Sequence, residues 1–476
     1  MRKLQSSVQV LSEDEVRLIH RSSLRLLERI GVLMPHAECL ESCRRAGGIV
    51  EVDSQTVRLP QSLMENFLQE FKARTHADLS ATPSDLSGVI STQVHVVDYL
   101  SGTRRLGELK DLRKGIALVQ HLENFPTANS VVVPSDVPNE LSDVMSFQLL
   151  YCYSRKPGGT YVLTPFAARH IVSMAEVMGR KAWFLIDPVS PLQFRKENLE
   201  IAAIFAHAGQ SIYIGSMVMA GATGPVTVAG TLTVQNAELL ASLFLVHALT
   251  GRFEYEVYNS GPHSMDPRTM ICSFGSANQV LFAIGMAQLA RFYGMQRVAN
   301  VGLTDALRPD FQCGFEKGAS AAFSLLAGVQ KIGCQGLVGA DQGFSFEQLV
   351  IDNEWLGFCN YILKGFEVTQ ETIAAELVET IGKGGNFLSE DHTARNFRKN
   401  LYASKIFNRE GWEAWLNRGA KDVLDQAHQY VEEKTSRHSA AEPVCTVHQF
   451  EELSRIVDCA RGELQKDETN SLPHLR

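Results

Sequence analysis

Short apolar runs alternate with longer stretches of helical spacing over the middle of the chain. Runs rich in β-branched and aromatic residues predict buried strands, and apolar residues three and four positions apart predict helices packed on one face. The predicted strands are 94–100, 128–134, 159–165, 183–193, 211–219, 253–260, 297–302 and 334–339. The predicted helices are 109–123, 140–153, 197–208, 237–249, 275–293 and 316–331. About eight strand–helix units favour a (β/α)8 TIM barrel over an open doubly wound sheet.

The two ends of the chain depart from this alternation. Near the N-terminus, helical patterns surround a short strand pair, and Ser12 and Glu15 have the spacing of a capping box. The C-terminal part carries many charges and no strand pattern. We therefore predict an α/β protein with an N-terminal α+β cap (1–88), a TIM-barrel catalytic domain (89–390) and a C-terminal helical extension (391–476).

A glycine-rich stretch, AGATGPVTVAGTL (220–232), joins one predicted strand to a long predicted helix. Glycine permits positive φ and close backbone approach. This loop follows a strand, and parallel α/β folds hold their ligands at the carboxyl ends of the strands. The stretch is either a ligand-binding loop or a tight turn packed for its own sake, and the pattern alone does not separate the two.

Composition and charge narrow the partners and the compartment. The 476 residues have a formal net charge of -8 and no cluster of lysine and arginine, which argues against nucleic acid as a partner. The N-terminus lacks the apolar core of a signal peptide, and no run approaches the roughly 18 apolar residues of a membrane span. The nine cysteines are scattered and form no CxxC motif. We expect a cytoplasmic protein that holds no metal.

Six stretches spread along the chain carry a more specific signal. They are 221–241 (GATGPVTVAGTLTVQNAELLA), 264–269 (SMDPRT), 281–294 (LFAIGMAQLARFYG), 304–317 (TDALRPDFQCGFEK), 347–354 (EQLVIDNE) and 386–398 (NFLSEDHTARNFR). In this order they resemble the trimethylamine methyltransferase family of corrinoid-dependent enzymes, in its branch without pyrrolysine. The resemblance implies a barrel that moves a methyl group from an amine to the cobalt of a separate corrinoid protein.

Two departures from the family pattern bear on the substrate. Every residue is a standard amino acid, so the pyrrolysine of members that act on trimethylamine is missing. The Ser-Lys pair expected before Pro309 is replaced by a stretch that ends in Leu307-Arg308. A tertiary amine is a poor leaving group, whereas a quaternary ammonium loses a methyl group as a neutral amine and needs no further activation. The first-choice substrate is therefore glycine betaine, giving dimethylglycine, with other betaines or a tertiary amine as alternatives.

A quaternary ammonium has no N–H donors, so aromatic faces and negative charge must bind it. The substrate-binding candidates near predicted strand ends are Tyr99, Tyr258, Phe344 and Phe346, with Tyr161, Phe166, Tyr213, Tyr255 and Phe311 as further aromatic residues in these regions. A betaine carboxylate would bind Arg308 or the backbone N–H groups of the loop at Gly221 and Gly224.

Two carboxylates are the catalytic candidates. Glu256 shares strand parity with Tyr258, which favours an inward side chain, and Asp98 lies near the end of the first predicted strand. The residues expected to face the corrinoid are His392, Asn259 and His263. A role for the segment around His392 in capping a helix is an alternative, since serine, aspartate and threonine surround it.

The chain contains no DxHxxG run of a corrinoid-binding domain, so we expect it to hold no cofactor tightly and to receive the corrinoid from a partner protein. A homo-oligomer is expected for a barrel of this size. Two readings compete with a methyltransferase. One is a barrel that binds a methylated amine or a corrinoid protein without turnover. The other is an aldolase or isomerase barrel, which needs a lysine at a strand end that these strands do not offer.

Overall fold

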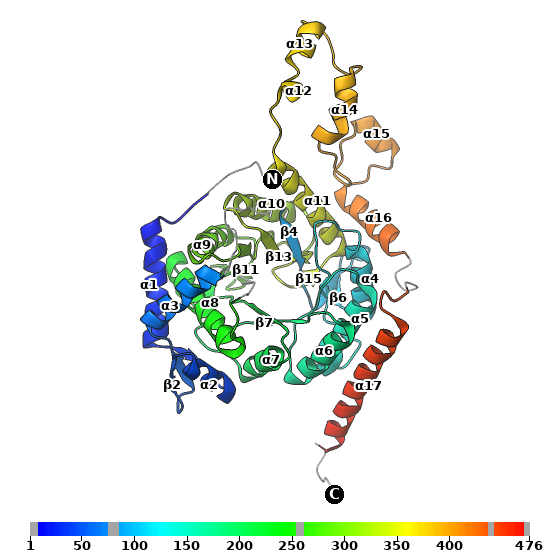
Figure 1. Ribbon diagram of the computed structural model, residues 1–476. Coiled ribbons are helices and arrows are strands. Elements are labelled where there is room, and N and C mark those ends of the chain that lie inside the picture. The colour runs from blue at the N-terminus through cyan, green and yellow to red at the C-terminus, as the bar shows by residue number, and fades with distance from the viewer. Residues whose placement is uncertain (1–7, 75–84, 254–260, 437–441, 471–476) are drawn as a thin grey trace.

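The computed structural model describes residues 8–74, 85–253, 261–436 and 442–470 of the chain (Figure 1). Its first elements are α1 (Glu13–Arg29), β1 (Val32–Leu33), α2 (Ala37–Arg45), β2 (Ile49–Glu51), β3 (Thr56–Arg58) and α3 (Gln61–Arg74). The Ser12 hydroxyl accepts from the backbone of Glu15, whose carboxylate accepts from the backbone of Ser12, so the predicted capping box is confirmed. The apolar face of α1 packs on a central helix, α8 (Val228–Thr250).

The middle of the chain contains parallel strands surrounded by helices (Figure 1). The strands are β4 (Ser87–Ile90), β7 (Trp183–Ile186), β8 (Ser211–Ile214), β12 (Val298–Ala299) and β13 (Lys331–Gln335). The helices and short 3-10 turn are α4 (Leu109–Val119), η1 (Asn139–Leu141), α5 (Ser142–Tyr153), α6 (Pro165–Met178), α7 (Lys196–His207), α8, α9 (Ala277–Tyr293), α10 (Phe311–Leu326) and α11 (Phe346–Lys364). The result is a mixed α/β architecture in which the helices pack against the strands and against one another.

The parallel strands pair in two groups. β7 pairs with β8 from Trp183↔Ser211 to Ile186↔Ile214, and β13 lies between β12 and β4. The predicted strands 128–134 and 159–165 are extended segments that exchange backbone hydrogen bonds, since Ser130 N–H donates to the Gly159 carbonyl at 3.0 Å. Most of the predicted strand 253–260 lies outside the described residues.

The first parallel strand is not the one predicted. The apolar run at 94–100 forms β5 (His95–Val97) in a hairpin with β6 (Arg104–Leu106), whereas the strand beside β13 is β4. β5 also pairs with β15 (Gly343–Phe344), which pairs with β14 (Leu337–Val338). A half-buried hairpin strand has the same alternating pattern as a barrel strand, so the apolar pattern did not distinguish them.

A further three-stranded sheet lies beyond the carboxyl ends of the strands. β10 (His263–Met265) is parallel to β9 (Met219–Ala220) and antiparallel to β11 (Cys272–Ser273). β9 opens the glycine-rich loop, and the helix that follows the loop is α8. The Thr227 hydroxyl caps α8 by accepting from Gly230 N–H, and Gly251 ends it in the left-handed conformation.

Helix α8 is the most apolar element of the core. It is long and apolar enough to cross a membrane by length and composition, but most of its residues are buried against the rest of the protein. The helices α1, α2, α7 and α9 contact it. Its amphipathicity is weak because it is covered on nearly all sides.

The C-terminal part is helical, as predicted. Four short helices project from the body (Figure 1): α12 (Gln370–Ile373), α13 (Ala375–Ile381), α14 (Asp391–Asn400) and α15 (Trp412–Asn417). The chain then returns through α16 (Val423–Thr435), which packs on α11, and ends with α17 (Val447–Asn470), which packs on α5 and α6.

Candidate functional site

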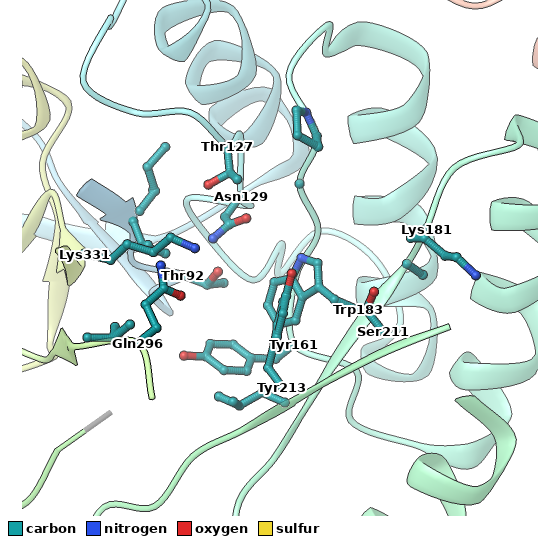
Figure 2. Close-up of a pocket in the computed structure, with 17 residues that line it drawn as sticks. Thr92, Thr127, Asn129, Tyr161, Lys181, Trp183, Ser211, Tyr213, Gln296 and Lys331 are labelled. Carbon is teal, nitrogen blue, oxygen red and sulfur yellow. The ribbon is translucent and has the colours of Figure 1, made fainter. Parts of the chain in front are cut away.

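A cavity of about 240 Å³ lies among the parallel strands (Figure 2). Residues from seven segments line it, within 89–92, 127–129, 157–161, 181–185, 211–213 and 296–298, and at 331. Four of these residues, Trp183, Ser211, Val298 and Lys331, are the first residues of their strands. The cavity therefore lies toward the amino-terminal ends of the strands, opposite the end at which the sequence predicted the site.

One wall of the cavity is aromatic. The ring centroids of Tyr161 and Trp183 are 6.3 Å apart with an interplanar angle of 78°, and those of Trp183 and Tyr213 are 5.9 Å apart at 41°. The three rings come from consecutive strand segments, and Tyr161 is 40% exposed. All three residues line the cavity, and the face of an aromatic ring attracts cations.

Polar side chains also line the cavity, next to the apolar residues Val89, Ile90 and Val298. They include Thr92, Asn129, Gln296 and Lys331 (Figure 2). A second lysine, Lys181, points away from the rings in Figure 2 and donates to the Gly209 carbonyl. The cavity thus combines three aromatic faces with one ammonium group and several hydrogen-bonding groups. Such a site suits a small zwitterion, with its cation against the rings and its anion toward Lys331.

Two carboxylates lie close together at the carboxyl ends of β7 and β8. Glu238 of α8 is fully buried, and it accepts from the Ser190 hydroxyl at 2.8 Å and the Ser216 hydroxyl at 2.5 Å. Asp187 follows the last residue of β7, and its Oδ1 is buried with no hydrogen-bond partner. Burial, together with the charge of Glu238, raises the pKa of Asp187 to about 7. This end of the strands therefore favours a proton or a cationic group.

His263, which the sequence singled out, lies in β10 with no exposed surface. Its Nε2 lies 3.2 Å from the side-chain nitrogen of Asn300, and the Phe274 ring packs on it with centroids 4.3 Å apart. Burial lowers the pKa of this imidazole to about 4. His263 is therefore neutral at pH 7. Its Nε2 accepts a hydrogen bond from the side-chain amide of Asn300.

The buried imidazole predicts a pH dependence of stability. Because its pKa lies below that of the unfolded chain, near 6.5, the unfolded state binds more protons at pH 5. The contribution of neutral His263 is therefore complete above about pH 6.5 and is lost as the pH falls toward 4. Between pH 7.5 and pH 5 we expect the native protein to lose about 2 kcal/mol more of its unfolding free energy than His263→Gln. Denaturant titrations at the two pH values measure this difference, and equal losses in both proteins would contradict it.

A buried ion pair fixes the ends of the last two strands. Lys317 of α10 lies 3.0 Å from the carboxylate of Asp352 in α11 and donates to the Gly302 carbonyl at 3.0 Å. The same carboxylate accepts from Gly336 N–H at 2.7 Å. Asp352 thus holds the chain after β13 while Lys317 holds the chain after β12, so the pair positions the loops that carry the strand-end residues.

The structure places the first two predicted residues away from the cavity. Asp98 accepts from Ser101 N–H at 2.8 Å in the β5–β6 turn, and hydrogen bonds from this turn lower its pKa. Tyr99 donates to Asp425 at 2.5 Å and stacks on His428 with ring centroids 4.0 Å apart. The contacts of Tyr99 attach the hairpin to α16, and the contact of Asp98 closes the turn of the hairpin. Both residues therefore stabilise the hairpin.

The remaining predicted residues are spread over several environments. Phe344 and Phe346 are buried and pack on each other with centroids 5.1 Å apart. Gly221 has φ +89°, and its N–H donates to the Gly224 carbonyl at 3.0 Å, so the two glycines close a tight loop. Arg308 is exposed in the loop before α10, and His392 lies on α14, outside the body. Glu256, Tyr258 and Asn259 lie outside the described residues.

Four residues of interest were missed from the sequence: Trp183, Lys331, Asp187 and Glu238. Trp183 was included in a strand but not chosen, although it has the same parity as the cavity residue Leu185. The sequence predicts Lys331 as the last residue of the helix 316–331, whereas in the structure it is the first residue of β13. Asp187 lay inside the predicted strand 183–193, so its position directly after β7 was not visible in the pattern. No sequence signal marks Glu238, whose neighbours in α8 are mostly apolar.

In the parts of the chain that the structure describes, no group of three or more histidine, cysteine, aspartate or glutamate side chains converges as metal ligands would. The cavity residues likewise offer oxygen, nitrogen and aromatic groups suited to an organic ligand.

Comparison with known proteins gives consistent matches along the chain. The family model described as trimethylamine methyltransferase (MTTB) matches residues 1–459. Glycine betaine methyltransferase of Desulfitobacterium hafniense (strain Y51) is 28% identical over 452 residues, covering 89% of this chain and 91% of that protein. Trimethylamine methyltransferase MttB of Methanosarcina barkeri (strain Fusaro / DSM 804) is 31% identical over 477 residues, covering 95% of each. Among solved structures, the Methanosarcina barkeri monomethylamine methyltransferase (MtmB) shares 11% identity with a TM-score of 0.43, over 92% of this chain and 96% of that chain.

Proposed function

Because the chain belongs to the trimethylamine methyltransferase family and is a methyltransferase, we propose that its methyl donor is a quaternary amine, with glycine betaine as the first choice. The methyl acceptor is the Co(I) of a separate corrinoid protein, and the other product is dimethylglycine. The observation that carries the choice of donor is the wall formed by Tyr161, Trp183 and Tyr213 opposite Lys331. The absence of pyrrolysine from the sequence supports the same choice.

The fold that accompanies this function is a closed (β/α)8 barrel. Two groups of parallel strands and seven segments around one cavity support closure. Consecutive β-segments that share an interior cavity in this way are characteristic of a barrel, whereas an open doubly wound sheet has two separate faces.

Glycine betaine binds with its trimethylammonium group against the three rings and its carboxylate toward Lys331 and Asn129. The cavity volume of about 240 Å³ is below the roughly 300–1,000 Å³ of pockets for drug-sized ligands, which suits a molecule this small. Aromatic faces bind a quaternary ammonium without needing a hydrogen from it. Arg308, the Gly221–Gly224 loop and Glu256, which the sequence suggested, stay predictions for contacts outside this cavity.

The protein contributes positioning to the methyl transfer. The carbon–nitrogen bond breaks toward nitrogen, which keeps the electron pair and leaves as a neutral tertiary amine. Trp183 and its neighbours hold the donor in one orientation, so that one methyl group is presented for transfer and little orientational freedom remains to be lost. Once the nitrogen has lost its charge, the aromatic wall binds it less strongly, which favours release of the amine.

Exposed apolar side chains support a protein partner. In loops that follow strands, and at the start of α10, large apolar residues are exposed: Met217, Val226, Met270, Ile271, Leu307, Phe311 and Phe315. Apolar side chains gathered on one face of a monomer mark interaction sites. The chain has no corrinoid-binding DxHxxG run, so the corrinoid comes from a partner protein, and its cobalt must reach the donor cavity at the amino-terminal ends of the strands rather than this face.

The reaction is tested with a panel of donors. The purified chain is mixed with a corrinoid protein held as Co(I), and the absorbance of the corrinoid is followed with glycine betaine, proline betaine, carnitine, choline, trimethylamine and dimethylglycine. We expect methylation with a quaternary betaine and none with trimethylamine, because only the quaternary nitrogen leaves as a neutral amine without further activation.

The other outcomes separate the alternatives. Turnover of trimethylamine would overturn the argument from the missing pyrrolysine while leaving a methyltransferase. Binding of glycine betaine by calorimetry without turnover, in the presence of an active corrinoid partner, would indicate a binding protein. Neither binding nor turnover of any betaine would remove the proposed donor class.

A further inference from the structure

A second feature of the molecule lies away from the cavity. Residues 366–420 form an arm that projects from the body between α11 and α16 (Figure 1). Its outgoing limb, residues 366–382, contains α12 and α13, and its returning limb, residues 391–418, contains α14 and α15. None of these four helices has a buried residue.

The arm is too exposed to be stable on its own. Its helices have 4, 7, 10 and 6 residues, and isolated helices shorter than about 12–15 residues are marginal in water. Leu388 is 83% exposed and Phe366 is 76% exposed. The other large exposed apolar residues of the arm are Val368, Ile373, Val378, Phe387, Phe397, Leu401, Trp412 and Leu416. A surface this apolar needs a partner to cover it.

The two limbs carry opposite charge. The outgoing limb has four glutamates and no lysine or arginine: Glu367, Glu371, Glu376 and Glu379. In the returning limb, α14 carries Arg395, Arg398 and Lys399 against Asp391. Among the described residues, no ion pair joins the glutamates of one limb to the basic residues of the other. The arm therefore offers an acidic and a basic surface that are not matched within one chain.

We propose that the arms of two copies of this chain pair about a two-fold axis. The acidic outgoing limb of each copy lies on the basic returning limb of the other, and the apolar side chains of both are covered between them. This inference does not depend on the methyl donor. It assigns a surface to the homo-oligomer that was expected from the sequence.

The charge pattern favours a second copy over any other partner. A two-fold interface uses the same surface on both subunits, so that surface must be complementary to itself. An arm with one acidic and one basic limb meets this condition, because a rotation by two-fold symmetry brings each limb to the limb of opposite sign. A different protein could be bound by a surface of one sign and would not require both.

The test reverses the charges of one limb at a time in the full chain. One variant reverses the outgoing limb with Glu371→Lys, Glu376→Lys and Glu379→Lys. Another reverses the returning limb with Arg395→Glu, Arg398→Glu and Lys399→Glu. Light scattering during gel filtration, at equal protein concentrations, gives the mass of each variant, of their mixture and of a chain that carries both reversals.

We expect the native protein to have the mass of two chains or a larger even multiple, and each single-limb variant to have half that mass. Mixing the two variants, or combining both reversals in one chain, should restore the native mass, because opposite charges then face each other again. This restoration also shows that the variants fold. A control triple, Glu65→Lys, Glu140→Lys and Glu451→Lys, reverses exposed glutamates of the body and should keep the native mass.

Four results would overturn the pairing of arms. The native protein could be a monomer at tens of micromolar. Both single-limb variants could keep the native mass, which would place the interface elsewhere. An odd multiple of the chain would exclude two-fold pairing, and loss of mass without restoration in the mixture would show that the limbs do not face each other.

Discussion

Replacing Trp183 with leucine is expected to lower kcat/KM for glycine betaine by about 30-fold. Trp183 is the central ring of the cavity wall, with Tyr161 on one side and Tyr213 on the other. A cation over a tryptophan face in a desolvated site gains about 2 kcal/mol, and each 1.4 kcal/mol changes the rate about tenfold. Leucine preserves apolar contact but has no π-face. Initial rates of corrinoid methylation across a range of glycine betaine concentrations measure the change.

Two further variants test whether the loss of activity comes from the missing aromatic ring at position 183. Trp183→Phe keeps an aromatic face, so its kcat/KM should fall less than that of Trp183→Leu. Tyr430→Leu removes a ring in α16, outside the cavity, and should leave kcat/KM close to the native value. A folded Trp183→Leu protein with native kcat/KM would exclude this cavity as the donor site. It would leave the methyltransferase assignment intact and direct attention to the carboxyl ends of the strands, where Asp187 and Glu238 lie.

The largest effect on stability is expected from Lys317→Met. The side chains of Lys317 and Asp352 are 1% and 0% exposed, and they form an ion pair at 3.0 Å. Removing one partner of a buried pair leaves an uncompensated charge, which costs about 3–5 kcal/mol. We therefore expect Lys317→Met to lower the unfolding free energy by this amount, as measured by denaturant unfolding at pH 7.

A double variant tests whether the cost arises from the unpaired charge. In Lys317→Met/Asp352→Asn the carboxylate is replaced by a neutral amide whose oxygen can still accept from Gly336 N–H. This protein should recover part of the lost stability. The ion pair of Lys405 with Glu123 is exposed at the surface, so Lys405→Met should change the unfolding midpoint little. Equal unfolding midpoints for Lys317→Met and Lys405→Met would show that the buried pair stabilises the fold no more than the exposed pair does.

The alternation of strands and helices was sufficient to predict most of the central elements. The segments around Trp183, Ser211 and Val298 become parallel strands because they are short, apolar and followed by helical spacing. The first strand was misplaced for a physical reason. β4 contains Ser87 and Gly88, which weaken its pattern, whereas the hairpin strand β5 contains the adjacent valines Val96 and Val97.

The site was harder to predict than the fold. Tyr161 and Tyr213 were named among the aromatic residues, but their contact through Trp183 depends on the register of neighbouring strands. Tyr99 had the expected residue type, yet Asp425, more than three hundred positions away in the chain, takes it to α16. Residue type and strand parity therefore gave candidates, and only the spatial arrangement chose among them.

Helix α8 has a consequence for the synthesis of the chain. Its 23 residues have the length and hydropathy of a membrane anchor, and in the folded protein they are mostly buried. A ribosome releases α8 before α9, one of the helices that cover it, has been made. During that interval the nascent chain resembles a substrate of the membrane-insertion machinery. Glu238 stands at the middle of α8, and an acidic residue at the centre of a bilayer costs about 2.5–3.5 kcal/mol on insertion scales. The carboxylate that Ser190 and Ser216 bind in the native fold thus also opposes the delivery of the unfinished chain to a membrane.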